Sequence, residues 1–381
     1  MQLTDQQQLF KKLAHDFAQR ELTDEVINNL EETSQLPPEL RRKMADIGIF
    51  GIKTPRKFGG VEADTVSYTQ VIQEIAYQHV GITLYFTMPN MLTGGGLLNY
   101  TNPEQKKKYL TPVAKGDMVI AFALTEPDAG SDAAAISTTA VEDGDYYVLN
   151  GHKTMITGAP YADIAITFAK TDPDARTHGI SCFVVDMHAP GVSLGKPESK
   201  MGITGCHTTD VILKNVRVPK EDMLGKLNKG FEIAMSTLDL GRLSVAAQSL
   251  GCARRAFDEA LAYAKVRKSM GKPIAKHQGI SFMLAEMATR LHALELMVYD
   301  TATLKDAKIP CNTEASMCKY YGAETCKWIV DRAVQIFGGY GYFKEYVVER
   351  LYRDARIFGI FEGTTEVQKI VISNDLIRNK H

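Results

Sequence analysis

The sequence lacks the short motifs with which many proteins hold metals or nucleotides. Its six cysteines include no CxxC pair, its nine histidines include no HExxH, and no GxGxxG follows a strand near the chain start. A GxSxG elbow is missing too, and Gly94-Gly95-Gly96 is not followed by the Gly-Lys-Ser/Thr of a Walker loop. These absences argue against a metal site and a Rossmann dinucleotide domain. We therefore expect no metal, buried free thiols, and close helix packing or a turn at residues 94–96.

Strong net charge and long apolar runs are missing as well. The formal net charge over 381 residues is −1, which gives no reason to expect nucleic acid or an anionic membrane as a partner. No apolar run approaches the ~20 residues that span a bilayer. Residues 1–5 are polar and resemble a helix start rather than a signal peptide. We therefore expect a cytoplasmic protein with no membrane span.

The hydrophobic pattern changes twice along the chain. Residues 1–118 have helical spacing, residues 119–222 consist of short apolar runs separated by turns, and residues 223–381 return to a helical period. In the middle part, Asp143-Gly144 predicts a hairpin, and the runs predict an antiparallel sheet or barrel. The last part predicts amphipathic helices of roughly 25–30 residues in an antiparallel bundle. We predict an α+β fold, mostly α, with three domains at residues 1–118, 119–222 and 223–381.

A single carboxylate near the end of the chain, Glu362, follows an apolar run. It precedes Gly363 and a predicted helix in which Thr365 and Gln368 have the spacing of a capping box. Apolar surroundings would raise the pKa of Glu362 toward neutral pH and make it a proton-abstracting base. Alternatively, Glu362 only stabilises the helix N-terminus, by ~0.3–1 kcal/mol. This stretch alone favours the second interpretation.

Other stretches are candidates for binding, and each has a structural alternative. Residues 124–132 form a loop rich in hydroxyl groups and small side chains, which either brings backbone N–H groups to a ligand or is an ordinary polar turn. Residues 153–158 close a strand, where Met and Thr side chains face a ligand or belong to the core. The cations from Arg267 onward either hold pyrophosphate or stabilise a helix C-terminus. The glycine-rich turn at residues 335–341 could cap a helix.

Taken together and in this order, the motifs resemble those of the acyl-CoA dehydrogenases, a family of FAD-dependent flavoproteins. The resemblance covers nearly the whole chain and is closest to the short-chain (butyryl-CoA) branch, through residues 237–242 and 245–248. It implies an N-terminal helical domain, a middle antiparallel β-barrel domain and a C-terminal four-helix bundle. It also implies FAD as the cofactor and a homotetramer built as a dimer of dimers.

The resemblance implies a role for each motif. Glu362 is the implied catalytic base, because Gly241, where some branches carry the base, has no side chain here. Met155 and Phe361 depart from the aromatic residue and the Tyr that the family often has, so both should alter the flavin potential or the pocket. The residues implied for substrate binding are Ser131, Asp239, Arg242 and Gly363. The residues implied for FAD binding, some of them from a neighbouring subunit, are Phe122, Leu124, Thr125, Ser131, Met155, Ile156, Thr157, Arg267, Met270, Gln278, Gln335, Ile336, Phe337, Gly338, Gly339, Thr364 and Glu366.

The implied reaction is the α,β-dehydrogenation of a short-chain acyl-CoA thioester to the trans-2-enoyl-CoA. Glu362 takes the α-proton, flavin N5 takes the β-hydride, and the electrons pass to electron-transferring flavoprotein. The alternative is the reverse reaction, an enoyl-CoA or aryl-acrylyl-CoA reductase fed by that flavoprotein. An acyl-CoA oxidase usually has an extra C-terminal domain, and a nucleic-acid-binding relative would need a basic face that the net charge does not support.

Overall fold

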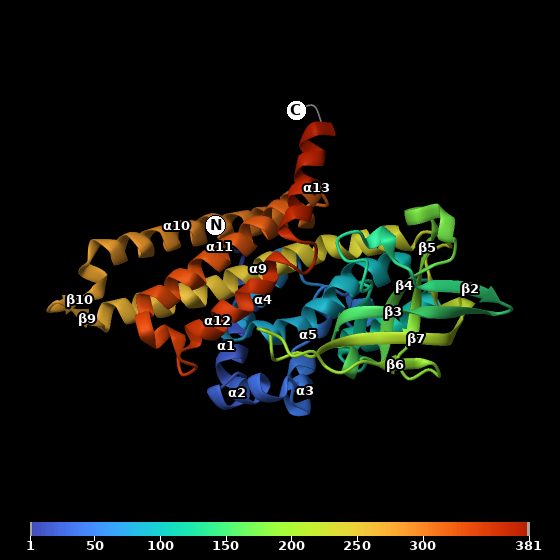
Figure 1. The fold of residues 1–381 in the computed structure, drawn as a ribbon, viewed down its shortest axis with the longest axis horizontal. Coiled ribbons are helices and arrows are strands. Elements are labelled where there is room, and N and C mark those ends of the chain that lie inside the picture. The colour runs from blue at the N-terminus through green and yellow to red at the C-terminus, as the bar shows by residue number, and fades with distance from the viewer. Residues whose placement is uncertain (1, 379–381) are drawn as a thin grey trace.

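The computed structural model describes residues 2–378, so Met1 and residues 379–381 of the first and last predicted domains lie outside the described residues. The elements follow the predicted order of helices, then strands, then helices (Figure 1). The first group consists of α1 (Asp5–Glu21), α2 (Asp24–Thr33), α3 (Pro38–Asp46), α4 (Thr65–Gln78), α5 (Val80–Met91), α6 (Leu97–Tyr100), α7 (Pro103–Gln105) and α8 (Thr111–Lys115).

The triple glycine at residues 94–96 confirms the prediction of close helix packing. It lies in a π-helical turn, Leu92–Gly96, that continues α5. A Cβ on Gly96 would come within 2.7 Å of Thr237 Oγ1, and one on Gly94 within 3.1 Å of Leu240. The missing side chains therefore let this turn approach the helix that carries Thr237, rather than forming a phosphate loop.

The middle part is an eight-stranded sheet with the order β6-β7-β3-β2-β4-β5-β8, and β1 lies beside β4. The hairpin predicted at Asp143-Gly144 joins β2 to β3. Most pairings are antiparallel, as predicted, but β4 pairs in parallel with β1 and, through Thr139 and Lys170, with β2. The long connection between β1 and β4, which contains the β2–β3 hairpin, allows this crossover. The strands are β1 (Ile120–Ala123), β2 (Thr139–Asp143), β3 (Tyr146–Thr157), β4 (Ile164–Lys170), β5 (Ile180–Asp186), β6 (Val192–Leu194), β7 (Thr208–Pro219) and β8 (Met223–Leu224).

The last part is built on three long helices, and the first of them exceeds the predicted length. Helix α9 has 37 residues, since its glycines serve packing and do not break it: a Cβ on Gly251 would lie 2.4 Å from the Gln73 carbonyl of α4. A small hairpin, β9 and β10, joins α9 to α10 at the tip farthest from the sheet, and α13 projects from the body (Figure 1). The elements are α9 (Gly230–Val266), β9 (Lys268–Ser269), β10 (Lys272–Pro273), α10 (Gln278–Asp306), α11 (Asn312–Phe337), α12 (Val347–Ala355) and α13 (Thr365–Arg378).

The hydrophobic cores do not follow the three predicted domains. The largest core contains side chains of α1 to α5 together with those of α9 to α12, so the two helical parts bury one common interior. A second core lies between α5–α8, one face of the sheet and the start of α9, and a third lies on the other face of the sheet. Burial of apolar surface therefore fixes α9 against all three parts of the chain.

Three expected absences can be compared with the described residues. All six cysteines are buried and free, as predicted. Over residues 2–378, no helix combines the length and apolar character that crossing a bilayer requires. The same residues contain no group of three or more His, Cys, Asp or Glu side chains that could hold a metal ion.

Candidate active site

Glu362 lies in a turn between the 3₁₀ turn Arg356–Gly359 and α13, with its side chain against α9. A Cβ on Gly241 would come within 2.6 Å of Glu362 Oε2 and 2.7 Å of Met91 Sδ. Within residues 2–378, no group donates a hydrogen bond to this buried Oε2 atom. The carboxylate therefore occupies the space that the missing side chain of Gly241 leaves open.

The backbone of this turn is strained and held from two helices. Glu362 has φ 53° and Gly363 has φ 84°, and the left-handed conformation costs a non-glycine residue about 1–2 kcal/mol. Lys319 Nζ of α11 donates to the Gly363 carbonyl at 2.5 Å. Gln368 Nε2 of α13 donates to the carbonyls of Gly363 at 3.0 Å and Glu362 at 3.2 Å. These three bonds compensate for the strain and fix the direction of the Glu362 side chain.

The predicted capping box is wrong in detail. The residue that caps α13 is Thr364, whose Oγ1 accepts a hydrogen bond from the Val367 N–H at 3.2 Å. Thr365 is instead buried, and its hydroxyl finds no partner among the described residues. Gln368 bonds to the carbonyls of the Glu362 turn rather than to the cap, because the left-handed turn directs these carbonyls toward the helix.

Burial decides the charge state of Glu362. Burial raises the pKa of Glu362 from 4.5 to about 7, although the charges of Lys319 and Arg242 act to lower it. The Arg242 guanidinium is nearly buried and bonds Asp239 at 2.9 Å, and burial raises the pKa of Asp239 despite that ion pair. Burial raises the pKa of Tyr68 of α4, the Glu362 charge is close enough to raise it further, and the Tyr68 hydroxyl lies 3.0 Å from Ser244 Oγ. A carboxyl with a pKa near 7 can accept or release a proton at neutral pH.

The loop predicted to bind a ligand after β1 is locked to the end of β3 by a buried ion pair. Lys153 Nζ lies 2.8 Å from Glu126 Oε1 and 3.1 Å from the Leu124 carbonyl, and neither charged side chain is exposed. Burial by itself would raise the pKa of Glu126, but Lys153 and the donors of Ser137 and Thr138 lower it to about 2. The pair therefore stays ionised and fixes the loop on the sheet.

The Glu126–Lys153 ion pair brings together the first group of predicted FAD-binding residues. The Thr154 N–H donates to the Thr125 carbonyl at 2.9 Å, which joins the loop to β3. A register shift between Lys153 and Ile156 turns Met155 outward, with φ 56° and 63% of its surface exposed. Phe122, Leu124, Thr125, Ser131, Met155, Ile156 and Thr157 thus all lie on β1, the following loop or the end of β3.

The second group of predicted FAD-binding residues lies at the opposite end of α9. Arg267 follows α9 and Met270, 92% exposed, lies in the β9–β10 hairpin. Gln278 begins α10, and residues 335–339 end α11 and open the next turn. From Gly241 to Arg267 the helix advances by about 39 Å at 1.5 Å per residue, so one chain does not bring this group to Glu362. Figure 1 shows the hairpin and the sheet at opposite ends of the molecule.

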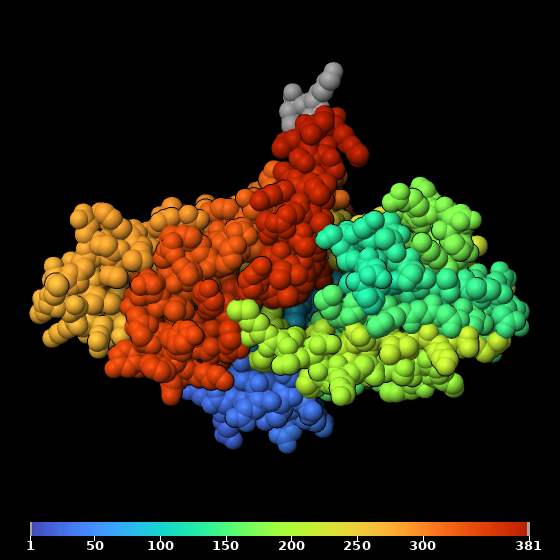
Figure 2. All heavy atoms as spheres, in the orientation of Figure 1, coloured from blue at the N-terminus to red at the C-terminus, as the bar shows by residue number. Residues whose placement is uncertain are grey.

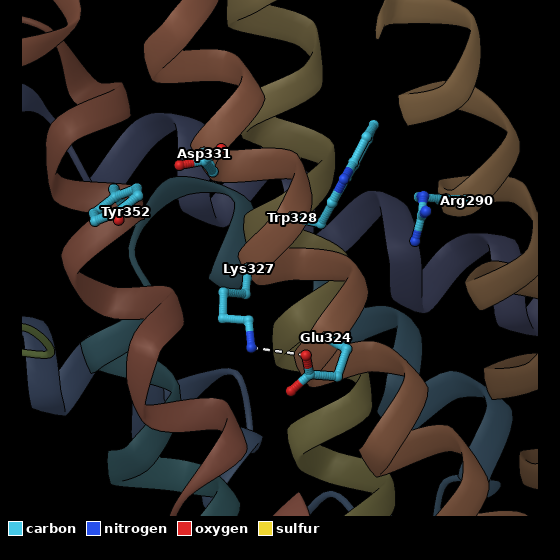
Figure 3. Close-up of a pocket in the computed structure, with 6 residues that line it drawn as sticks. All are labelled: Arg290, Glu324, Lys327, Trp328, Asp331 and Tyr352. Atoms are coloured by element: carbon cyan, nitrogen blue, oxygen red, sulfur yellow. Dashed lines mark hydrogen bonds and ion pairs between the residues drawn. The ribbon is translucent and has the colours of Figure 1, made fainter.

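A pocket of about 410 Å³ lies elsewhere, between α10, α11 and α12, and contains none of the predicted site residues (Figure 3). Trp328 lines it, and the guanidinium groups of Arg290 and Arg332 lie 4.4 Å and 4.8 Å from the centre of the Trp328 ring. Lys327 pairs with Glu324 at 2.7 Å. The charged residues of this pocket are partly exposed, whereas the Lys319 side chain beside Glu362 is fully buried. The hollow between the C-terminal segment and the middle sheet, visible in Figure 2, is separate from this pocket.

Comparison with known proteins identifies the class. Three family models match the chain in order: the N-terminal domain of acyl-CoA dehydrogenase over residues 4–117, the middle domain over residues 121–216, and the C-terminal domain over residues 228–377. The chain belongs to the acyl-CoA dehydrogenase family. It is therefore an oxidoreductase with the three-part fold of that family, and its cofactor is FAD.

Individual relatives are similar over their whole length. The caffeyl-CoA reductase-Etf complex subunit CarC of Acetobacterium woodii is 52% identical, over 99% of this chain and 100% of that one. The 3-(aryl)acrylate reductase of Clostridium sporogenes is 51% identical over the same shares. Butyryl-CoA dehydrogenase of Megasphaera elsdenii has a solved structure with a TM-score of 0.96, at 40% identity over 99% of this chain and 100% of that one.

The motif glycines fit FAD as a ligand that approaches the backbone. Gly130, Gly279 and Gly339 have neither a positive φ nor any atom within 4 Å of where a Cβ would be, so nothing within the chain requires a glycine there. Gly130 lies in the loop of the first group of FAD-binding candidates, Gly339 is a member of the second group, and Gly279 follows Gln278 of that group. The first group contains several hydroxyl side chains that can donate hydrogen bonds to FAD. The second group contains Arg267, whose guanidinium can bind the pyrophosphate of FAD.

Sequence reasoning missed Lys319, Tyr68 and Met91 as neighbours of Glu362, and did not assign the Glu126–Lys153 pair. A signal for Lys319 was present: it is a charged residue among the small side chains of a helix face that includes Ala315, Cys318 and Gly322. Such a charge is unusual in a core and marks either a paired ion or a functional group. Tyr68 and Met91 carry no signal of this kind, since apolar and aromatic residues are ordinary in buried helices.

Proposed function

We propose that this protein interconverts an acyl-CoA thioester and its trans-2-enoyl-CoA, and that Glu362 carries the α-proton. The observation that carries the proposal is the state of the Glu362 carboxylate. Its Oε2 atom is buried and has no hydrogen-bond partner among the described residues, and its pKa is about 7. In the direction of dehydrogenation the carboxylate takes a proton from the α-carbon, and in the reverse direction the carboxylic acid returns it. FAD, when bound, exchanges the hydride at the β-carbon.

The thioester makes the α-proton acidic enough for this base when donors stabilise the charge on the carbonyl oxygen. Lys319 and Gln368 bind the carbonyls of the turn, and among the described residues the Glu362 N–H has no acceptor, so it is available for that oxygen. One donor of this kind contributes about 3–4 kcal/mol in other enzymes. We infer that Gly363, Ser131, Asp239 and Arg242 contact the substrate, with the Asp239–Arg242 pair toward the CoA part.

A second copy of the chain completes the cofactor site in this proposal. Along α9 the second group of FAD-binding candidates lies about 39 Å from Gly241, which is beside Glu362. The first group lies on the sheet, at the end of the molecule opposite the tip, so a single FAD meets both groups only if they come from different chains. The exposed side chains of Val266, Met270, Phe282 and Tyr342 at the tip support an interface there. A homotetramer made of two such dimers fits the family resemblance, and six free cysteines fit a cytoplasmic location.

The direction of the reaction is the finer question, and the relatives favour reduction as a second candidate. Two relatives above 50% identity are named a caffeyl-CoA reductase-Etf complex subunit and a 3-(aryl)acrylate reductase. We therefore propose electron-transferring flavoprotein as the redox partner for either direction. The two candidates are a short-chain acyl-CoA dehydrogenase and a reductase for aryl-acrylyl-CoA.

Anaerobic mixing tests both candidates. We expect butyryl-CoA or an arylpropionyl-CoA to bleach the flavin band of the purified holoenzyme, and the corresponding enoyl-CoA to reoxidise the reduced enzyme. The faster acyl group identifies the substrate class. We expect Glu362→Gln to retain FAD and bind acyl-CoA but bleach about 10²–10⁴-fold more slowly, the range for loss of a general base.

A matched control is Glu221→Gln, an exposed carboxylate beside the middle sheet, which should leave the rate unchanged. Rapid bleaching by Glu362→Gln would show that another residue is the base. A protein that cannot be loaded with FAD, or that no acyl-CoA bleaches, would overturn the proposed reaction.

A further inference from the structure

Lys319 is a buried lysine that the reaction described above does not require. Its side chain has no exposed surface, and its ammonium group binds the Gly363 carbonyl at 2.5 Å, next to the residue that carries the proton. Gln368 already donates to the same carbonyl at 3.0 Å. A neutral donor is thus sufficient to hold the turn, and a buried charge calls for a further explanation because burial disfavours it.

The groups around Glu362 show what that charge faces. From α9 comes Arg242, which is already paired with Asp239. From α4 comes Tyr68, whose hydroxyl bonds to Ser244. From α11 comes Lys319, which also faces Glu324, and from α13 comes Glu366, an exposed carboxylate. Since Asp239 offsets much of the charge of Arg242, Lys319 is the cation of this set that forms no ion pair with any residue the structure describes.

We propose that Lys319 is a positioning residue for Glu362: its ammonium group holds the turn through Gly363, and its charge favours the ionised, proton-accepting form of the carboxylate. This inference rests on the proposed function of Glu362. It extends that proposal by assigning the turn and the base to one side chain on a different helix. Gln368 then shares the mechanical part of the task but not the electrostatic part.

The protonation states agree with this assignment at neutral pH. Burial lowers the pKa of Lys319 to about 8, while the Glu362 carboxylate acts to raise it. The pKa of Glu362 is about 7, so deprotonation of Glu362 precedes that of Lys319 as the pH rises. Between these two values the base is ionised and the lysine still carries its proton.

Three substitutions in the FAD-loaded enzyme separate the two tasks. Lys319→Met removes donor and charge, Lys319→Gln retains a donor without charge, and Lys319→Arg retains the charge. We expect the acid limb of the pH profile of flavin reduction to move to higher pH by about one unit in the Met and Gln variants, with an approximately fivefold lower rate at pH 7 and a tenfold lower rate well below it. The Arg variant should retain the limb near its original pH.

A second readout does not depend on turnover. The ¹³C carboxyl resonance of Glu362, assigned by its absence in Glu362→Gln, should titrate at higher pH in Lys319→Met and Lys319→Gln of the oxidised holoenzyme. Lys53→Met is the matched control, because Lys53 is another largely buried lysine, bonded to the Ala63 carbonyl at 2.9 Å and to Thr65. It should lower stability without moving the Glu362 titration.

The outcomes distinguish the inference from the proposal beneath it. A Glu362 resonance that titrates at the wild-type pH in Lys319→Gln, or one that moves equally in Lys53→Met, overturns the role of Lys319. If Lys319→Met does not fold, the Gln and Arg variants decide the same point. Rapid flavin bleaching by Glu362→Gln would instead overturn the role of Glu362 itself.

Discussion

Two regions along α9, one around Gly241 and one around Arg267 at its C-terminal end, differ in how far their candidate ligand-binding residues are buried. At Gly241 the charged groups are buried, paired across helices and fixed by backbone hydrogen bonds. Near Arg267 the candidate residues are exposed, and Met270 retains 92% of its accessible surface. This contrast supports the proposed dimer, in which one chain supplies the buried Glu362 turn and the exposed tip of a second chain supplies the remaining FAD contacts. Four substitutions test this contrast.

The largest expected effect concerns the buried ion pair on the sheet side. Lys153→Met leaves the Glu126 carboxylate buried without its counter-ion, which should lower the free energy of unfolding by about 3–5 kcal/mol. Lys272→Met at the exposed tip should change it by less than about 0.5 kcal/mol. Denaturant unfolding of both variants measures the difference. Equal losses in the free energy of unfolding would show that the buried ion pair contributes no more to stability than the exposed tip does.

The second effect is an expected increase in the free energy of unfolding when Glu362 is replaced by Gln. The pKa of Glu362 is raised from 4.5 to about 7 in the folded state, so the folded protein binds more protons than the unfolded one between these values and loses stability as the pH rises. Glu362→Gln removes this loss. We expect it to be more stable than wild type by on the order of 3 kcal/mol above pH 7, with no difference below pH 4.5. A gain that is independent of pH would contradict the buried-acid interpretation.

The third effect tests whether a second chain supplies the tip. Arg267→Ala should weaken FAD binding by about 1.5–3 kcal/mol, the range for a hydrogen bond to a charged group. Each hybrid dimer of an Arg267→Ala chain and a Glu362→Gln chain should contain one site with both native residues. At an FAD concentration too low to load Arg267→Ala, we therefore expect refolded mixtures to recover flavin reduction that neither parent shows. No recovery in verified hybrids would mean that both residues act within one chain.

The smallest effect distinguishes the two threonines at the start of α13. Thr364→Val should cost about 1 kcal/mol, because it removes the hydroxyl that caps the helix. Thr365→Val retains the shape of a buried side chain whose hydroxyl has no partner among the described residues, and should be neutral or slightly stabilising. Thermal unfolding of the two variants compares them directly. If Thr365→Val were the less stable variant, Thr365 would be the residue that caps α13, as the sequence suggested.

The order of elements and the loop motifs were predictable because they depend on local pattern. Hydrophobic periodicity predicted strands within residues 119–222 and long helices after them, and Asp143-Gly144 predicted its hairpin. The parallel pairing of β1 was not predictable, since it depends on where the chain returns after the β2–β3 hairpin. The length of α9 was underestimated because Gly241 and Gly251 break a helix in isolation but allow close packing here.

The candidate site was predictable only as a set of motifs. The apolar run before Glu362 suggested a raised pKa, and the pKa of about 7 agrees with that suggestion. The neighbours that oppose this rise, Lys319 and Arg242, come from positions 43 and 120 residues earlier in the chain (362 − 319 and 362 − 242). Contacts at such separations depend on the packing of α9 and α11, which single-sequence patterns do not specify.

The common core of the two helical parts has a consequence for how the protein is made. Side chains from Ala14 to Phe86 bury themselves against side chains from Leu240 to Phe358, with the whole sheet between them in the sequence. During synthesis the first helices therefore emerge long before the surfaces that cover them exist. Contacts of such long range slow folding and leave apolar surface open to aggregation. The newly made N-terminal half should depend on chaperones until α9 and α11 have left the ribosome.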